Sequence, residues 1–395
     1  MNVSNESLVA TGKISSSTRD LRVVFDMTFP NRLQTGTRVY ANELLAALQI
    51  SSSHRFTCLA EPVPERSRSI GRKIWNGIRN ILWIQIVLPI RLLRLKADVL
   101  HAPSFFAPLL CPCPVILTIY DTLYLTQEQH YGDRLFLLYA KLFIKPAVKR
   151  CALISTISQA SRGDILSAFG IPQQKIHVIY PGVSSRFRPT LDAAEITRVR
   201  EKYHIASPFF LFVGALEPRK NLPCLLRAFS LFLKASQGGE QYRLVLAGPG
   251  GPAFAELQQI THQLGISEQV RFLGYVTDDD IPSLYSAADA FVFPSLGEGF
   301  GLPIVEAMAC GTPVVTSNVS SIPEVAGDAA VLVDPEDVQA LARAMERVVF
   351  DDDLRRQLVK KGMERAALFT WPRAAQETEQ LYAMVCNGRI GGLRS

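Results

Sequence analysis

Two glutamates with the chemistry to hold a polyhydroxylated ligand, Glu298 and Glu306, stand with seven residues between them. Three glycines surround the first of them: Gly297, Gly299 and Gly301. Glycine lets a backbone approach a ligand closely, because no side chain stands in the way. A phosphate site between two acceptors of sugar hydroxyls is the pattern that recognition of a nucleotide sugar requires.

The elements on either side of this loop supply the phosphate site. The apolar run 290–293 predicts a buried strand, and the segment after the loop predicts a helix with Pro303 in its first turn and Gly311 beyond its end. Free N–H groups at the start of that helix attract an anion. The alternative is that one glutamate is a surface residue favoured by the helix dipole and the other forms an ordinary ion pair on the helix.

Two adjacent cations follow another predicted strand. Arg219 and Lys220 come after the apolar run 209–214, in a loop that precedes a helical pattern. Loops at the carboxyl ends of strands bind ligands in open α/β sheets, and Arg and Lys neutralise a diphosphate there. A solvated pair of loop charges is the alternative, because exposed Lys and Arg are the norm.

The stretch EGFGLPIVEAMACGTPVV, which begins at Glu298, is similar nearly residue for residue to the retaining glycosyltransferases of family 4, whose Glu-x7-Glu motif lies at this strand–loop–helix turn. The resemblance extends over most of the chain. It implies the GT-B architecture, in which two Rossmann-like α/β domains face each other across a cleft. It also implies transfer of a hexose from a nucleotide diphosphate sugar to an acceptor hydroxyl, with retention at the anomeric carbon. Enzymes of this architecture need no Asp-x-Asp metal motif, so we expect no metal and no cofactor.

The resemblance implies roles for individual residues as well. Glu298 would hold hydroxyls of the sugar and Glu306 those of the ribose, while Lys220 and Arg219 would stabilise charge on the leaving diphosphate. The remaining predicted contacts are Gly299, Phe300, Gly301, Leu302, Tyr275, Val276, Gly36, Tyr120 and Asp121. Of these, the backbone at 275–276 is expected to meet the nucleotide base.

Three positions depart from the family's usual pattern. Tyr120 stands where a His usually precedes Asp121, and Ala215 stands where an Arg usually follows the glycine at the strand end. The loop after the first strand has one glycine, Gly36, where many relatives carry two. A tyrosine hydroxyl donates to sugar or phosphate but gains no positive charge near neutral pH, and His130 is the nearest alternative imidazole.

The length of 395 residues suggests two domains of ordinary size. Apolar runs that alternate with amphipathic segments are typical of parallel sheets with crossover helices. We expect a disordered lead-in at 1–20, domains at 21–186 and 187–370, and a final helix at 371–386 that crosses back onto the first domain. The predicted strands are 21–27, 55–59, 98–101, 115–120, 152–156, 175–179, 209–214, 242–248, 270–274, 290–293, 312–317 and 331–333.

The composition argues against several classes of protein. No apolar run reaches the roughly 18 residues of a spanning helix, and the first residues lack the basic start and apolar stretch of a signal peptide. Seven scattered cysteines argue for a reducing compartment, so we expect a cytoplasmic protein. The formal net charge of +6 favours anionic partners such as nucleotide diphosphates, anionic lipid or nucleic acid.

Residues 66–96 carry eight Lys or Arg and no acid, with apolar and aromatic residues between the charges. A basic amphipathic segment suits the surface of an anionic membrane, where each cation contributes about 1 kcal/mol. A helix that buries its apolar side in the core and exposes a basic side fits the same periodicity. Nucleic acid is the less favoured partner, because no recognised binding module accompanies the charges.

The leading hypothesis is a hexosyltransferase of cell-envelope polysaccharide synthesis at the inner face of the membrane, with a glycan or lipid-linked acceptor. The segment EPRKN at 217–221 is similar to mannosyl- and rhamnosyltransferase-like members, so GDP-mannose is the first choice of donor. The alternatives are a protein of the same fold that binds a nucleotide sugar without turnover, a nucleotide-sugar epimerase or a phosphorylase, and a basic nucleic-acid-binding protein. The oligomeric state does not follow from the sequence.

Overall fold

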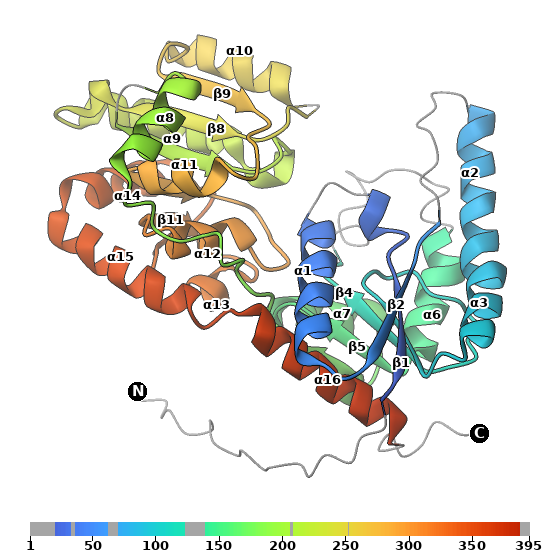
Figure 1. The fold of residues 1–395 in the computed structure, drawn as a ribbon. Helices are drawn as coiled ribbons and strands as arrows, with labels where there is room; N and C mark the ends of the chain where they lie inside the picture. The colour runs from blue at the N-terminus through green and yellow to red at the C-terminus, as the bar shows by residue number, and fades with distance from the viewer. Residues whose placement is uncertain are drawn as a thin grey trace.

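The computed structural model describes residues 20–32, 36–61, 70–122, 139–205, 208–251 and 253–387. Figure 1 shows two α/β bodies connected by a linker and by a long helix at the end of the described chain. Each body is built around one six-stranded sheet. Residues 1–19 of the predicted lead-in lie outside the described residues, as does His130.

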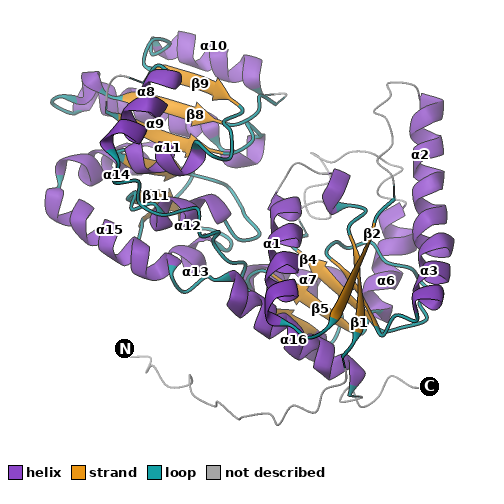
Figure 2. Ribbon diagram, viewed as in Figure 1, coloured by secondary structure: helices purple, strands orange, loops and turns teal. Residues whose placement is uncertain are grey.

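The first sheet is parallel, with the strand order β2-β1-β3-β4-β5-β6. Its strands are β1 (Arg22–Asp26), β2 (Arg55–Leu59), β3 (Val99–Ala102), β4 (Val115–Ile119), β5 (Leu153–Thr156) and β6 (Ile176–Val178). All residues of β3, β4 and β5 are buried, because helices cover both faces of the sheet (Figure 2). Burial on both faces explains why these strands are mostly apolar. Their polar members, His101, Thr118, Ser155 and Thr156, are buried as well.

In the described part of the first domain the helices are α1 (Gly36–Ser51), α2 (Ile70–Leu82), α3 (Leu88–Leu95), α6 (Lys145–Arg150) and α7 (Gln159–Phe169). A π-helical turn, η2 (Trp83–Val87), connects α2 to α3, and a second one, η3 (Ala140–Ile144), runs into α6. Two 3-10 turns, η1 (Pro30–Arg32) and η4 (Gln173–Lys175), complete this part. Ser158 caps α7, since its side chain accepts from the N–H of Ser161 at 3.0 Å.

The second sheet is also parallel, with the order β12-β11-β10-β7-β8-β9. Its strands are β7 (Phe209–Val213), β8 (Arg243–Ala247), β9 (Val270–Gly274), β10 (Ala290–Phe293), β11 (Val314–Ser317) and β12 (Val331–Val333). The chain moves outward from β7 through β8 to β9 and then returns to place β10 on the other side of β7. Ligands bind at such a reversal of strand order, outside the carboxyl ends of the strands.

The helices of the second domain are α8 (Ala193–Lys202), α9 (Leu222–Ala235), α10 (Phe254–Leu264), α11 (Ile281–Ala287), α12 (Leu302–Ala309), α13 (Ile322–Ala326), α14 (Val338–Phe350) and α15 (Asp352–Ala366), with 3-10 turns η5 (Pro218–Lys220) and η6 (Gly239–Gln241). The predicted strands of both domains are confirmed, and each observed end lies within two residues of the predicted one. The domain boundary predicted at 186/187 falls between the last strand of the first sheet and the first strand of the second. The exact boundary stays a prediction.

The last helix, α16 (Trp371–Cys386), crosses back and lies beside α1, as predicted (Figure 1). Thr370 caps its start. The hydroxyl of Tyr382 lies 2.7 Å from Nδ1 of His101, which is fully buried, and the ring of Trp371 stands edge-on to Tyr40 with centroids 5.6 Å apart. The final helix therefore contributes to the core of the first domain.

A contact between the domains that the sequence did not predict involves Glu324 of α13. Its carboxylate accepts hydrogen bonds from the backbone N–H groups of Gln159 and Ala160, at 3.1 and 3.2 Å, at the first turn of α7. A helix start carries free N–H groups and the positive end of the dipole, so a carboxylate stabilises it. Nearby, Oγ of Ser161 donates to the carbonyl of Gly299 at 3.2 Å. The loop that contains the glycines is thereby fastened to the first domain.

Candidate active site

The glycine loop, residues 297–301, follows β10 and leads into α12. Gly301 has a φ of +104°, which favours glycine, and it caps the start of α12. A Cβ on Gly299 would lie 2.7 Å from the backbone oxygen of Tyr120 in the first domain, so the two domains approach here only because this residue is glycine. Oγ of Ser321 donates to the carbonyl of Glu298 at 2.8 Å. The loop is thus held by both domains at the start of the helix.

A buried ion cluster lies beneath the loop. Glu298 accepts from Nζ of Lys220 with one carboxylate oxygen and from Nη1 of Arg219 with the other, each at 2.7 Å. Ser295 Oγ donates to the first of these oxygens at 2.6 Å. The ammonium of Lys220 also lies 4.6 Å from the centre of the Phe293 ring, a cation–π contact. The cluster forms because the loops after the adjacent strands β7 and β10 meet at one edge of the sheet.

The cluster combines two cations with one carboxylate. Burial lowers the pKa of Lys220, although the charge of Glu298 opposes that shift. Burial would raise the pKa of Glu298, but the charges of Lys220 and Arg219 and the hydrogen bonds to its oxygens outweigh it, so its pKa lies below the ordinary value. Lys220 and Arg219 are side chains that can neutralise a phosphate beside the loop, although Arg219 also lies 3.9 Å from the carboxylate of Glu217. Both oxygens of Glu298 are engaged by protein groups, and its predicted bonds to sugar hydroxyls stay a prediction.

Glu306, the second glutamate of the Glu-x7-Glu motif, lies half-buried on α12 and is not part of this cluster. Its carboxylate accepts from the hydroxyl of Tyr285 at 3.2 Å. Burial raises the pKa of Glu306 to about 7, and the bond from Tyr285 and the charge of Arg186 only partly offset that effect. Glu306 therefore changes its charge near neutral pH.

This titration predicts a pH-dependent stability. Because the folded state binds the proton of Glu306 more tightly than the unfolded chain, its stabilising contribution is complete below the ordinary glutamate pKa and is lost as pH rises to about 7. We expect Glu306→Gln to raise the free energy of unfolding relative to wild type by about 1–3 kcal/mol at pH 8 and to have little effect near pH 4. Urea unfolding at several pH values measures this difference. Glu336→Gln, at an exposed position, is the control, and an equal effect at both pH values would contradict the assignment.

Tyr120 and Asp121 lie at the carboxyl end of β4, opposite the glycine loop. The Tyr120 hydroxyl donates to the carbonyl of Pro103 at 3.1 Å, and its ring stands edge-on to Tyr40 at 5.2 Å. Its hydrogen-bond donor is thus directed at the first domain rather than toward the loop. The charge of Asp121 acts on Arg219, which places this carboxylate near the ion cluster.

The other residues predicted to contact the donor differ in how far they are exposed to solvent. Phe300 belongs to the loop, but its side chain is buried in a core cluster, with its ring 5.3 Å from that of Phe369. In the turn after β9, Val276 is buried, whereas the neighbouring Tyr275 is 70% exposed. Leu302 is half-buried at the start of α12. Gly36 is exposed at the first residue of α1, in the first domain.

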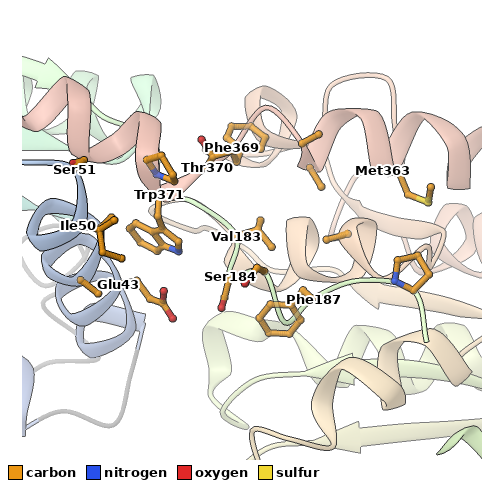
Figure 3. Close-up of a pocket in the computed structure, with 18 residues that line it drawn as sticks. Glu43, Ile50, Ser51, Val183, Ser184, Phe187, Met363, Phe369, Thr370 and Trp371 are labelled. Carbon is orange, nitrogen blue, oxygen red and sulfur yellow. The ribbon is translucent and has the colours of Figure 1, made fainter. Parts of the chain in front are cut away.

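A separate pocket of about 700 Å³ lies where the linker after the first domain meets α1 and the junction of α15 with α16 (Figure 3). Figure 3 shows Ile50 and Glu43 on one side and Phe187 and Met363 on the other, with Trp371 between. No predicted site residue lines this mostly apolar pocket, and it is distinct from the ion cluster. Within the described parts of the chain, no group of three or more His, Cys, Asp or Glu is arranged to hold a metal ion.

Two protein-family models together match most of the chain. Residues 35–187 match the model described as Glycosyltransferase Family 4, and residues 195–365 match the one described as Glycosyl transferases group 1. The chain belongs to the family 4 glycosyltransferases, as the sequence resemblance predicted, and it is an enzyme of that class. Membership favours transfer over epimerisation, binding without turnover or nucleic-acid recognition.

Among the similar proteins is O-antigen chain mannosyltransferase B of Escherichia coli, which is 36% identical over 73% of this chain and 75% of its own length. Serotype-specific mannosyltransferase WbdA of Escherichia coli is 34% identical over 64% of this chain, which spans only 31% of that longer protein. Among solved structures, the sucrose-phosphate synthase of Thermosynechococcus elongatus matches with a TM-score of 0.74 and 21% identity, over 94% of this chain and 100% of that one. This likeness confirms the predicted GT-B fold.

Proposed function

We propose that this glycosyltransferase transfers mannose from GDP-mannose, with retention, to a hydroxyl of a glycan or lipid-linked acceptor in the synthesis of a cell-envelope polysaccharide. The observation that carries the proposal is the pair of cations, Lys220 and Arg219, held by Glu298 beside the glycine loop at the start of α12. Two similar proteins named as mannosyltransferases support the choice of sugar.

The chemistry follows from where charge develops. When the bond between the sugar and the nucleoside diphosphate breaks, negative charge grows on the leaving phosphate. Preorganised cations and N–H groups stabilise such charge without reorganisation, which is the largest single contribution in many enzymes. Lys220, Arg219 and the start of α12 fill this role here, and Glu298 keeps the two cations in place. We propose that no metal takes part, since the protein itself supplies the positive charge.

Glu306 is proposed to accept hydrogen bonds from the ribose hydroxyls, and the backbone at 275–276 to meet the base. The acceptor is proposed to attack on the face from which the diphosphate leaves. We place the reaction at the cytoplasmic face of a membrane, with peripheral contact between the protein and anionic lipid. None of the helices in the described part of the chain combines the length and the apolar character that crossing a bilayer requires.

The first experiment is thermal unfolding in the presence of UDP-, GDP-, dTDP- and ADP-sugars, with wild type beside Glu306→Ala. A ligand that binds only the folded state raises the melting temperature. We expect the largest shift with GDP-mannose in wild type and a smaller one in the variant. A larger shift with another base would contradict the donor, and an unchanged shift in the variant would contradict the role of Glu306. The anomeric configuration of the product, read by NMR, tests retention.

A further inference from the structure

An exposed apolar stripe runs along the outer side of α2, η2 and α3. Its members are Trp75, Ile78, Leu82, Ile86, Ile90 and Leu93, which recur at intervals of three or four residues. Trp75 and Leu93, near its two ends, are both 61% exposed. Recurrence at this interval places the side chains on one face of a helix. Figure 1 shows these helices as one long rod at the outer edge of the first domain.

Along η2 and α3, the opposite face of the rod is already packed. Ile84, Leu88 and Leu92 are buried in a core cluster with the first sheet, and each lies two positions from a member of the stripe. Two positions correspond to about 200° around a helix, so the stripe and the buried face point in opposite directions. The segment is therefore anchored in the fold through η2 and α3 without the stripe. The core-facing alternative holds for Ile84, whereas the residues of the stripe are exposed.

Cations flank the stripe and extend onto a second helix. Arg91 and Arg94 on α3 and Lys96 at its C-cap are exposed, and the guanidinium of Arg91 lies 4.9 Å from the centre of the Trp83 ring. The segment η3–α6 packs into the same core cluster and exposes four more cations: Lys141, Lys145, Lys149 and Arg150. Neither 66–96 nor 139–150 contains an acid. The exposed Leu142 adds an apolar side chain on the second helix.

We propose that this face, formed by α2, α3 and α6, docks the enzyme on an anionic phospholipid bilayer, with the apolar stripe inserted at the boundary between headgroups and acyl chains. A basic amphipathic helix with Trp and Leu on its apolar face binds in that manner, through buried apolar area and attraction to anionic lipid. Exposed cations on segments that themselves carry no acid match an anionic lipid surface, although Arg79 of α2 is paired with Glu61. A protein partner would have to present acidic residues around an apolar groove. The inference deepens the membrane contact of the proposed function by naming the surface and its lipid.

The test is co-sedimentation of the full chain with vesicles of phosphatidylcholine, with and without phosphatidylglycerol. We expect wild type to bind the anionic vesicles at least about tenfold more strongly than the neutral ones, and high salt to reduce the difference. Two double variants test the two parts of the surface: Trp75→Ser with Leu93→Ser, and Arg94→Glu with Lys145→Glu. Each is expected to weaken binding to anionic vesicles about tenfold or more. The matched control on α9, Leu231→Ser with Lys234→Glu, also changes an exposed apolar and an exposed basic residue and is expected to bind as wild type does.

Wild type that fails to bind anionic vesicles, or variants that bind like the control, would overturn the proposal. Sedimentation velocity adds a further outcome: a wild-type dimer that becomes a monomer in the Trp75→Ser and Leu93→Ser variant would mean that a second copy covers the stripe, which also overturns it. The donor-induced thermal shift is measured on the same samples. Lost lipid binding with a normal shift rejects only the docking surface, and normal lipid binding without a shift rejects only the donor.

Discussion

Replacement of Lys220 by methionine is expected to lower kcat/KM for sugar transfer by about 10²–10³-fold, the usual cost of removing one preorganised group that stabilises developing negative charge. Methionine keeps an apolar stem of similar length and removes the ammonium that lies 2.7 Å from Glu298. The loss has two sources in this geometry: the diphosphate loses a cation, and Glu298 keeps a negative charge that is balanced by Arg219 alone. Initial rates of transfer from GDP-mannose, with the folded fraction measured in parallel, give the value.

The chain offers a matched control in Lys175, which is buried to the same extent, with 7% exposure for each lysine. Its ammonium donates to the carbonyls of Lys149 and Cys151, each at 2.9 Å, in the first domain. Lys175→Met is expected to lower stability and to leave kcat/KM of the folded protein unchanged. An equal loss of kcat/KM in both variants would mean that the loss comes from removing any buried lysine, and not from the position of Lys220 at the site.

A double variant separates the two sources of the Lys220 effect. Glu298→Gln removes the carboxylate that Lys220 neutralises, so Lys220→Met in that background no longer leaves the charge of Glu298 without its lysine partner. If Lys220 acts on the leaving phosphate, the double variant stays at least as slow as the single one. Recovery of activity in the double variant would show that Lys220 serves only to neutralise Glu298, and the coupling energy from the full cycle measures that share.

The strands and the glycine loop follow from local sequence, because buried parallel strands need continuous apolar runs and the loop needs glycine at fixed positions. β10 and β9 begin and end where the sequence predicts. The ion-pair and hydrogen-bond partners of the site's side chains do not follow from local sequence. Lys220 and Glu298 are 78 residues apart, and they meet only because β7 and β10 are neighbours in the sheet. The sequence assigned both to one donor site without indicating that they would pair with each other.

Two further contacts had no signal in the sequence. Glu324 follows a proline at the start of a short helix, and its bonds to Gln159 and Ala160 depend on how the two domains are placed. Asp280 stands at the N-cap of α11, but its side chain makes no capping hydrogen bond. Its side chain instead accepts from Arg198 and Lys202 of α8, a helix that lies about 80 residues earlier. Electrostatic complementarity between distant elements is a property of the assembled fold, so periodicity and spacing within one segment do not reveal it.

Gly182→Ala is expected to lower the free energy of unfolding by about 2–3 kcal/mol, in the upper range for overpacking, and to lower kcat as well. A Cβ at Gly182 would lie 2.2 Å from the backbone nitrogen of Trp371 and 2.6 Å from the carbonyl carbon of Thr370. Backbone atoms cannot yield as the end of a flexible side chain does, so the linker or the start of α16 has to move. The adjacent hydrogen bond, from the N–H of Val183 to the carbonyl of Phe369 at 2.9 Å, moves with it.

The effect on kcat follows from the position of this crossing, where the chain leaves the first domain and later returns to it. A shift there changes the position of the glycine loop relative to Tyr120 of the first domain, although no residue of the ion cluster is replaced. Gly163→Ala on α7 is the control, because its new Cβ meets no atom within 4 Å and lies in an exposed helix interior, where alanine stabilises by about 0.5–1 kcal/mol. Urea unfolding and initial rates of both variants give the comparison. Normal stability with normal kcat in Gly182→Ala would show that the linker and α16 accommodate the new Cβ without moving the domains. The close packing of the linker on α16 would then have no part in aligning the site.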